Sequence, residues 1–240
     1  MPITGKRVCI TGGAGFIGSY LVQHLIEHNE IVVYDNLHRN ALQFAHVDGH
    51  PHLHFIKGDV MDYDASRRAI DKCDIVIHCA AIAGVYSVDR NAVRTMEVNM
   101  LGTHQVVKAA LDVGVERFVE FSTSEVYGPF IHKGKEDDLT TIGPIGESRW
   151  IYAASKLASE HLSYAHYKED GLPLAIVRPF RAAQHTVDEI LDEAPRANLR
   201  SVVVERDRRV LQRLQHHAAN RAVADLPRSV DVEGPHDGQR

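Results

Sequence analysis

The chain has 240 residues, of which 44% are hydrophobic and 25% are charged, and its formal net charge is −5. A chain of this size can form one large domain, or a domain with a small companion. The net negative charge and the lack of runs of Lys or Arg argue against nucleic acid and membrane surfaces as partners. No apolar run approaches the roughly 18 residues of a membrane span, and no apolar leader follows Met1. We therefore expect a cytoplasmic protein.

Segments rich in Val and Ile alternate with helical segments along most of the chain, which is the pattern of a parallel sheet covered on both faces. Six strands are expected, at 7–11, 31–34, 53–57, 74–79, 117–122 and 174–177. Long helices are expected at 16–28, 91–113 and 152–167. This order predicts an α/β fold, a Rossmann-type doubly wound parallel sheet that extends to about residue 180.

Neither the cysteines nor the histidines suggest a metal site. Cys9, Cys73 and Cys79 are odd in number, lie in apolar contexts and form no Cys-x-x-Cys pair, so we expect buried thiols without disulfides. In the sequence His-Pro-His-Leu-His at 50–54, an extended chain points His52 and His54 to the same side. No Cys, Asp or Glu lies at ligand spacing, so no metal is expected.

A glycine-rich turn follows the first strand. The sequence Thr-Gly-Gly-Ala-Gly-Phe-Ile-Gly at 11–18 stands between a strand and a helix, which lets backbone N–H groups approach a pyrophosphate at the positive end of the helix. Asp35 ends the second strand, where a carboxylate accepts hydrogen bonds from the ribose of NAD and repels the 2′-phosphate of NADP. The prediction is NAD; alternatively, Asp35 opens a turn with Asn36. No phosphate-loop NTPase sequence is present.

Tyr152 and Lys156 begin a helical segment at the spacing i, i+4, which places them on one helical face. A phenol has a pKa of about 10 and is a poor base at neutral pH unless its anion is stabilised. The Lys156 ammonium and a positively charged nicotinamide would lower the pKa of Tyr152. Tyr152 is thus a candidate acid/base, although an isolated pair of this kind can also be a plain surface feature.

Together these segments resemble a known family, the extended short-chain dehydrogenase/reductases that act as nucleotide-sugar epimerases, dehydratases and decarboxylases. The matching sequences are Thr-Gly-Gly-Ala-Gly-Phe-Ile-Gly at 11–18, Asp-Asn-Leu at 35–37, Gly-Asp at 58–59, His-Cys-Ala-Ala at 78–81, Asn99, Phe-Ser-Thr-Ser-Glu-Val-Tyr-Gly at 121–128, Tyr-x-x-x-Lys at 152–156 and Val-Arg-Pro-Phe at 177–180. The resemblance covers residues 3–180.

The resemblance implies roles for residues that spacing alone leaves open. Asp59 would reach the adenine, although from its position it could equally cap a helix. Ala80 and Ala81 would line the cofactor, and Asn99 would support the substrate side. The expected NAD-binding residues are Gly12, Gly15, Phe16, Ile17, Gly18, Asp35, Asn36, Asp59, Val60, Ala80, Ala81, Tyr152 and Lys156.

The resemblance also implies the chemistry. Tyr152 would take a proton from a sugar hydroxyl while the sugar carbon gives a hydride to NAD, and Thr123 would hydrogen-bond the reacting oxygen. Lys156 would hold the nicotinamide ribose. The intermediate would be a 4-keto nucleotide sugar, with a UDP-sugar as the first candidate substrate. Family members dimerise through helices that correspond to 91–113 and 152–167, so a homodimer is expected.

The residues after Thr123 bear on the fate of that intermediate. Sugar dehydratases of the family carry Thr-Asp-Glu where this chain has Thr-Ser-Glu, and Ser124, expected on the substrate side, is a much weaker acid than aspartate. Glu125 would be the catalytic carboxylate; alternatively, it opens a helix or loop. The triplet and Arg149-Trp150 resemble UDP-glucuronate decarboxylases, but the same triplet occurs in epimerase-like members. We expect an epimerase, an isomerase by reaction, with a decarboxylase as the alternative.

The resemblance ends at Phe180. Residues 1–180 hold all 16 aromatic residues and all 8 Lys, whereas residues 181–240 hold none of either and 10 Arg. We expect an NAD-binding domain at 1–180 and an Arg-rich tail at 181–240, helical over 199–226 and disordered at its end. The family's C-terminal substrate domain would then be missing, and a shifted reading frame would explain the change. On that reading, a truncated NAD-binding module without turnover is a further alternative.

Overall fold

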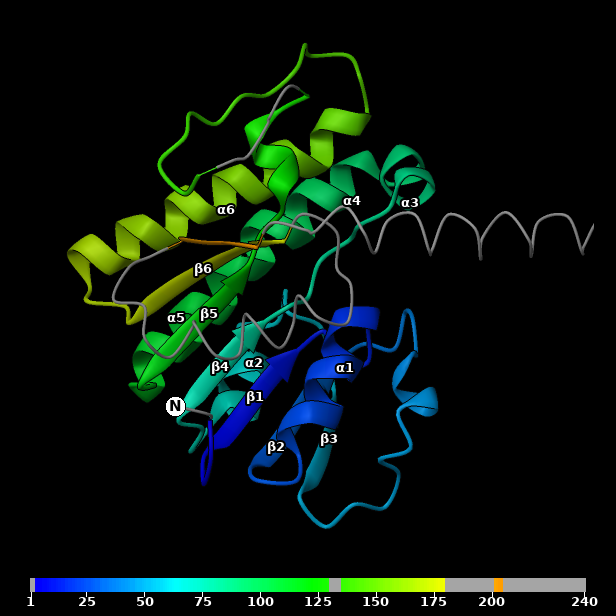
Figure 1. Cartoon of the computed structure of the whole chain (residues 1–240), viewed down its shortest axis with the longest axis vertical. Coiled ribbons are helices and arrows are strands. Elements are labelled where there is room, and N and C mark those ends of the chain that lie inside the picture. The colour runs from blue at the N-terminus through cyan, green and yellow to red at the C-terminus, as the bar shows by residue number, and fades with distance from the viewer. Residues whose placement is uncertain (1–2, 130–134, 180–200, 205–240) are drawn as a thin grey trace, which may run out of the picture. The chain divides into compact units, whose positions relative to one another are not determined.

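The computed structural model describes residues 3–129, 135–179 and 201–204, the last by backbone alone. These residues form one parallel sheet in the strand order β3-β2-β1-β4-β5-β6-β7 (Figure 1). The strands are β1 (Arg7–Thr11), β2 (Glu30–Asp35), β3 (Leu53–Lys57), β4 (Ile75–His78), β5 (Arg117–Phe121), β6 (Leu174–Pro179) and β7 (Ser201–Val204). The order reverses between β1 and β4, which is where open α/β sheets bind their ligands.

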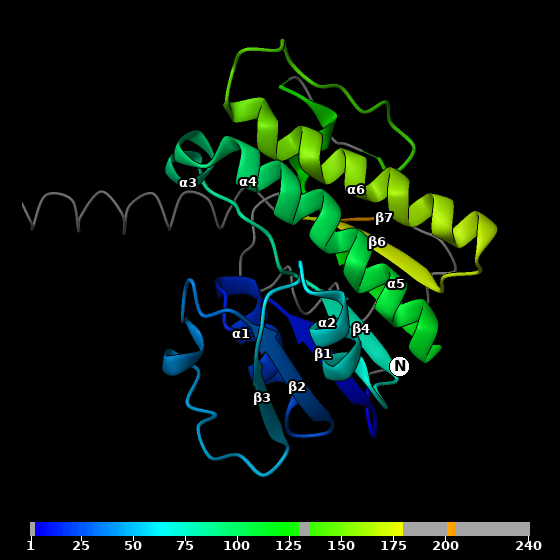
Figure 2. The ribbon, with the colours of Figure 1, turned by 180° about the vertical axis from the view of Figure 1, so that it is seen from behind.

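Helices cover both faces of the sheet. Figure 1 shows α1 in front of β1 and β2, and Figure 2, from behind, shows α2, α5 and α6 across the opposite face. The helices are α1 (Phe16–Leu25), α2 (Tyr63–Ile70), α3 (Val85–Arg90), α4 (Ala92–Met96), α5 (Thr103–Val113) and α6 (Arg149–Glu169). Shorter turns are η1 (Leu42–Phe44) and η3 (Ser124–Tyr127), and the π-helix η2 (Glu97–Gly102) joins α4 to α5.

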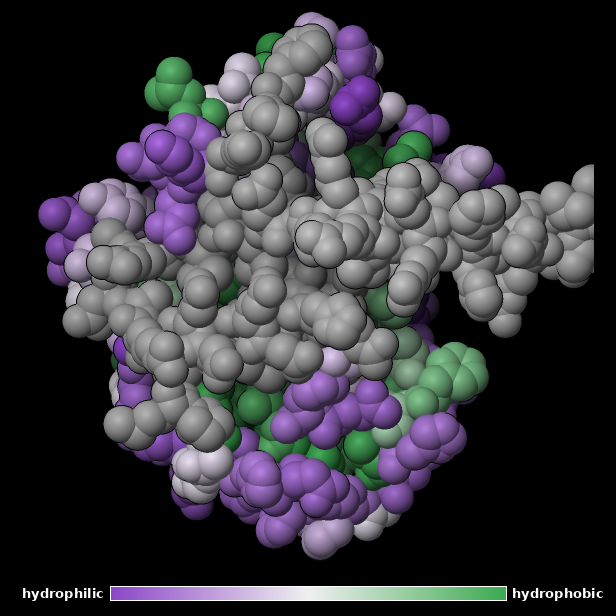
Figure 3. Space-filling view, viewed as in Figure 1, coloured by the Kyte–Doolittle hydropathy of each residue, from purple (hydrophilic) through white to green (hydrophobic). Residues whose placement is uncertain are grey.

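Alternate residues of each strand supply two apolar cores, one on each face of the sheet. Val8 and Ile10 of β1 pack in the cluster that contains Leu21 of α1. Cys9, between them, packs in the other cluster with Val106 of α5. Burial on both faces explains why the strands are continuous apolar runs. In Figure 3, hydrophilic residues cover much of the described part of the α1 face, with hydrophobic residues exposed between them.

The expected α/β fold and its six strands are confirmed, within a residue or two at their ends. Two of the three expected helices differ in their limits: α1 ends at Leu25, and α6 begins at Arg149. The third, at 91–113, is not one continuous α-helix because η2 interrupts it. The short helices α2 and α3 had not been expected.

The strand β7 was also unexpected, because residues 201–204 fall in the segment for which a helix was expected. They instead pair with β6, Ile176 opposite Ser201 and Pro179 opposite Val204. Three consecutive valines favour a strand, and the open edge of β6 offers backbone partners. The other expectations for the tail concern 180–200 and 205–240, which lie outside the described residues. Among the helices described, none is long and apolar enough to span a membrane.

Candidate active site

Two glycines at the turn after β1 are packed so closely that neither position has room for a side chain. Gly12 has φ +68, and a Cβ there would lie 2.7 Å from the backbone of Ala80. A Cβ on Gly18 would lie 2.3 Å from the carbonyl oxygen of Gly12. Gly18 therefore lets α1 start directly against the turn, and Gly12 lets the turn touch the segment after β4.

The N-terminus of α1 is open to an anion. Gly15 is its N-cap residue, with an extended backbone, and among the described residues no side chain caps this end of the helix. The first turn carries no acidic residue, so no carboxylate within the helix offsets its partial positive charge. Phe16 is 75% exposed beside it. A turn of glycines and one buried alanine at an uncapped helix start fits the pyrophosphate of a dinucleotide.

Asp35 lies at the end of β2 and faces this turn. Its Oδ2 accepts a hydrogen bond from the Ala14 N–H at 3.0 Å, and its Oδ1 accepts one from the Leu37 N–H at 2.7 Å. Burial raises the pKa of Asp35, and the two backbone N–H groups oppose that shift. The turn expected as the alternative role is thus present. Since a carboxylate has about four acceptor positions, Asp35 can hold the turn and still accept ribose hydroxyls.

Asp59 does not cap a helix. The N-cap of α2 is Asp62, whose side chain accepts from the Ala65 N–H. Asp59 instead accepts from the Met61 N–H at 3.0 Å through Oδ1 and pairs with Arg94 at 3.1 Å through Oδ2. The helix-cap alternative is therefore wrong. Asp59 remains a polar group beyond β3, partly exposed, on the side of the sheet where the strands end.

The other expected cofactor residues differ in exposure. Val60 is 6% exposed, and its side chain packs where Gly102 of η2 leaves space. Ala80 and Ala81 follow β4 and are partly exposed, with Ala80 against the glycine turn. Asn36 accepts a hydrogen bond from the His38 N–H on the surface. Of these residues, Ala80 is the one that packs directly against the glycine turn.

Tyr152 lies in the first turns of α6 beside η3. Thr123, the N-cap of η3, accepts from the Glu125 N–H and hydrogen-bonds Tyr152. Burial and the nearby Glu125 charge raise the pKa of Tyr152 to about 12, against the effect of the Thr123 hydrogen bond. Burial also raises the pKa of Glu125, and the charge of Arg149 opposes this. Thr123, Tyr152 and Glu125 thus form one cluster, and Ser124 precedes Glu125 within η3.

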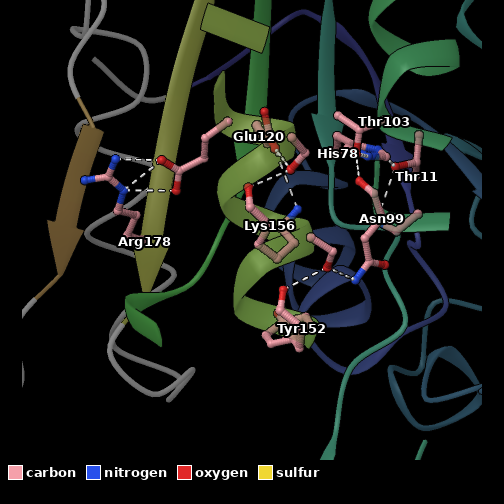
Figure 4. Close-up of polar contacts among 12 residues, drawn as sticks. Thr11, His78, Asn99, Thr103, Glu120, Tyr152, Lys156 and Arg178 are labelled. Atoms are coloured by element: carbon pink, nitrogen blue, oxygen red, sulfur yellow. Dashed lines mark hydrogen bonds and ion pairs between the residues drawn. The ribbon is translucent and has the colours of Figure 1, made fainter. Parts of the chain in front are cut away.

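Lys156 is directed toward Glu120 of β5 rather than toward the Tyr152 ring (Figure 4). Its side chain is 1% exposed, and its Nζ lies 3.7 Å from Oε1 of Glu120 on β5. Figure 4 shows the two side chains directed toward each other, away from the Tyr152 ring. The pKa of Tyr152 is raised by burial and, secondarily, by the charge of Glu125.

A chain of hydrogen bonds crosses the core behind the site (Figure 4). The Ala80 N–H donates to Thr11 Oγ1, which contacts His78 Nδ1 at 2.6 Å. On the other side His78 Nε2 contacts Thr103 Oγ1 at 2.9 Å, and Thr103 donates its proton to the Asn99 carbonyl. Thr103 must therefore accept from His78, and we assign His78 as the neutral tautomer with its proton on Nε2.

Burial, and secondarily the Lys156 charge, lower the pKa of His78 to about 3. The histidine therefore stays neutral at physiological pH. A neutral imidazole that both donates and accepts joins β1 to α5 without placing a second positive charge near Lys156.

Asn99, on η2, is fully buried and engaged within the protein. Its Oδ1 accepts from the Ile82 N–H, while its Nδ2 donates to the Ile82 carbonyl and to Ser155 Oγ. Ser155 in turn donates to the Tyr152 carbonyl at 2.8 Å. Both amide hydrogens of Asn99 are thus used to connect the segment after β4 with the start of α6. The geometry makes Asn99 a support for the helix that carries Tyr152.

The buried partners Glu120, His78, Ser155 and Ser159 were not predicted as part of the site. One signal was visible for Glu120, an acidic residue inside the apolar strand Phe-Val-Glu-Phe. Within 3–129 and 135–179, no three His, Cys, Asp or Glu side chains gather as metal ligands. The three cysteines are free thiols.

Comparison with known proteins decides the family. The model of the NAD dependent epimerase/dehydratase family matches residues 8–187. The chain belongs to this family. Its members are NAD-dependent enzymes that act on nucleotide sugars, and they include epimerases, dehydratases and decarboxylases.

Three relatives show the range of reactions. UDP-N-acetyl-alpha-D-glucosaminuronate decarboxylase of Bacillus cytotoxicus is 35% identical over 73% of this chain and 54% of its own. The solved UDP-N-acetylglucosamine 4-epimerase of Methanobrevibacter ruminantium M1 is 29% identical over 74% of this chain and 55% of its own, with a TM-score of 0.67. A dTDP-glucose 4,6-dehydratase of Streptomyces venezuelae, solved with NAD bound, is 31% identical over 78% of this chain and 62% of its own, with a TM-score of 0.63. The chain spans about half the length of the curated relatives it matches.

Proposed function

We propose that this chain binds NAD and carries the catalytic residues for oxidation of a nucleotide sugar at C4, in a reaction of the epimerase type. The observation that carries the proposal is the Thr123–Tyr152 hydrogen bond, made by a residue that follows β5, the strand next to β4 in the sheet. A UDP-sugar is the first candidate substrate, as the names of the epimerase and decarboxylase relatives suggest. The assignment of residues 1–180 to this function, and a homodimer, are part of the proposal.

The residues present fit NAD. Gly12, Gly15 and Gly18 would leave room for the pyrophosphate at the uncapped start of α1. Asp35 would accept the ribose hydroxyls, for which its carboxylate keeps free acceptor positions. Phe16 and Ile17 of the first helical turn, Asn36, Asp59 and Val60 beyond β2 and β3, and Ala80 and Ala81 after β4 complete the proposed contacts. When bound, NAD supplies the acceptor for the hydride of the sugar carbon.

Tyr152 would move the proton of the reacting hydroxyl through its Oη, with Thr123 fixing the position of that oxygen. A pKa of about 12 means that Tyr152 holds its proton at neutral pH, which suits donation to a ketone oxygen. Removing a proton from a hydroxyl requires a stabilised phenolate. Lys156 lies one turn along α6 and would supply the positive charge, while also holding the nicotinamide ribose.

Ser124 and Glu125 favour epimerisation over dehydration, because serine cannot act as the acid that expels water. Asn99 would act on the substrate side only through the position that it gives α6. A decarboxylase is the second candidate, favoured by one observation: Glu125 and Arg149 interact beside Tyr152, a charged pair that can orient a sugar carboxylate.

Calorimetric titration with NAD, followed by UDP-glucose, UDP-N-acetylglucosamine and UDP-glucuronate with product analysis, tests the proposal. The expected result is NAD binding and a C4 epimer as product; carbon dioxide from UDP-glucuronate would select the decarboxylase. Tyr152→Phe should abolish turnover and keep NAD binding, whereas Tyr164→Phe, on an exposed side chain of the same helix, should change neither. NAD binding with no sugar turnover would leave only the NAD-binding module.

A further inference from the structure

Glu120 is a carboxylate in the centre of the sheet. It lies on β5 between Val119 and Phe121, and it is 0% exposed. Transfer of an isolated carboxylate into such surroundings costs several kcal/mol, so a buried glutamate is kept ionised only by hydrogen bonds and an opposite charge. The proposed catalytic roles leave this residue without a function.

The contacts of Glu120 are those of an ionised carboxylate. Its Oε1 accepts the Ser159 hydroxyl at 2.6 Å, which is the short distance typical of a charge-assisted O–H···O⁻ bond. The same oxygen lies 3.7 Å from Nζ of Lys156. Its Oε2 is buried and has no hydrogen-bond partner in the part of the chain that the structure describes, so the carboxylate has capacity for one more donor.

Among the groups around Lys156, Glu120 is the one whose negative charge is available to balance the ammonium. From β4 it is faced by His78, which burial keeps neutral, and by Cys79, whose thiol pKa is raised by burial. The other carboxylates are engaged: Glu160 is held by Arg178 through contacts of 2.6 to 3.1 Å, and Glu125 acts on Tyr152. Glu120 is therefore the negative group paired with Lys156 among the described residues.

We propose that Glu120 is the buried counter-ion that keeps the Lys156 ammonium protonated and holds it in place, so that Glu120 is a positioning residue acting through Lys156. The ion pair stands by itself, and only its consequence for the reaction rests on the proposed function. Ser159, one turn after Lys156, ties the carboxylate to the same helix and completes the arrangement.

A double-mutant cycle on the full chain tests the pair without any ligand. Glu120→Gln keeps an acceptor for Ser159 and removes the charge, while Lys156→Met removes the ammonium. In urea unfolding at pH 7, we expect Glu120→Gln to lower the folded-to-unfolded equilibrium constant roughly 100-fold or more, because it leaves a buried ammonium unpaired. The double variant Glu120→Gln/Lys156→Met should recover at least about tenfold of that loss.

The pH dependence separates a charge pair from a merely structural hydrogen bond. In Glu120→Gln the buried Lys156 ammonium loses its opposite charge, so burial penalises the charged form and stability should rise with pH toward about 10. The matched control Ser159→Ala removes the hydrogen bond and leaves both charges. The stability that this variant loses should therefore not change with pH. Glu120→Asp should retain most of the stability.

Equal, pH-independent losses in Glu120→Gln and Ser159→Ala, with no recovery in the double variant, would overturn the proposal. A double variant that is no more stable to urea than Glu120→Gln alone would also overturn it. NAD titration at pH 7 is the functional arm: Glu120→Gln should bind NAD at least about fivefold more weakly, because a neutral or displaced Lys156 cannot hold the ribose. If the wild-type chain failed to bind NAD, the proposed function would fail while the unfolding cycle would still decide the role of Glu120.

Discussion

His78 should make the protein sensitive to acid. The pKa of this buried histidine is lowered to about 3, mainly by burial, from an ordinary value of 6.5. Between these values the unfolded chain binds a proton that the folded chain does not, so the free energy of unfolding falls as the pH falls through this window. Each pH unit corresponds to about 1.4 kcal/mol. From pH 7 to pH 4, His78 alone should therefore cost about 3 kcal/mol.

The assay is urea unfolding at pH 7, 6, 5 and 4, followed by the fluorescence of the single tryptophan, Trp150. His78→Gln loses hydrogen bonds and should be less stable by about 2 kcal/mol at pH 7, but it lacks the titrating group. Its deficit should vanish or reverse near pH 4. His161→Gln, an exposed position on α6, controls for loss of a histidine at the surface. Parallel pH curves for wild type and His78→Gln would refute the reasoning.

Three further changes probe other parts of the structure. Gly18→Ala places a Cβ 2.3 Å from the Gly12 carbonyl oxygen, so we expect a loss of about 2 kcal/mol in urea unfolding and weaker NAD binding by calorimetry. Asp62→Ala removes the N-cap of α2 and should cost about 1 kcal/mol, with NAD affinity unchanged. Glu160→Gln leaves the Arg178 guanidinium unpaired in a nearly buried site and should cost about 3 kcal/mol; unfolding at high pH should not relieve this loss, since arginine stays charged.

Most of the sheet could be predicted because its strands are buried on both faces and appear as apolar runs of the right length. The π-helix could not be, since a one-residue widening of a helix does not change the hydrophobic pattern on either side. The segment of α2 is rich in charged residues and buries only a short face, so the helical spacing of its apolar residues is hard to recognise in the sequence. Its start signal, Asp62, was visible. For 201–204, the spacing of Val203, Val210, Leu211 and Leu214 suited one side of a long helix, and this longer pattern outweighed the short run of valines.

The candidate site was predicted in its motifs but not in its interactions. The closeness of Thr123 and Tyr152 agrees with the roles expected for them, whereas the direction of the Lys156 side chain does not follow from its spacing along a helix. That direction depends on Glu120, which comes from another element and is brought near only by the packing of α6 on β5. The same holds for His78, whose two hydroxyl partners come from β1 and α5. Pairings across elements need the fold before they can be assigned.

The π-helix η2 has a consequence for insertions and deletions. Its six residues, Glu97–Gly102, separate two helices that each need a fixed side toward the core. Because a π-turn is one residue wider than an α-helical turn, removing one residue there can restore an ordinary turn and leave α5 in its place on the sheet. Removing one residue within α5 itself would instead rotate the part of the helix beyond it by about 100° and carry Ala110 off the sheet. Library selections that sample single-residue deletions should therefore be more depleted within 103–113 than within 97–102.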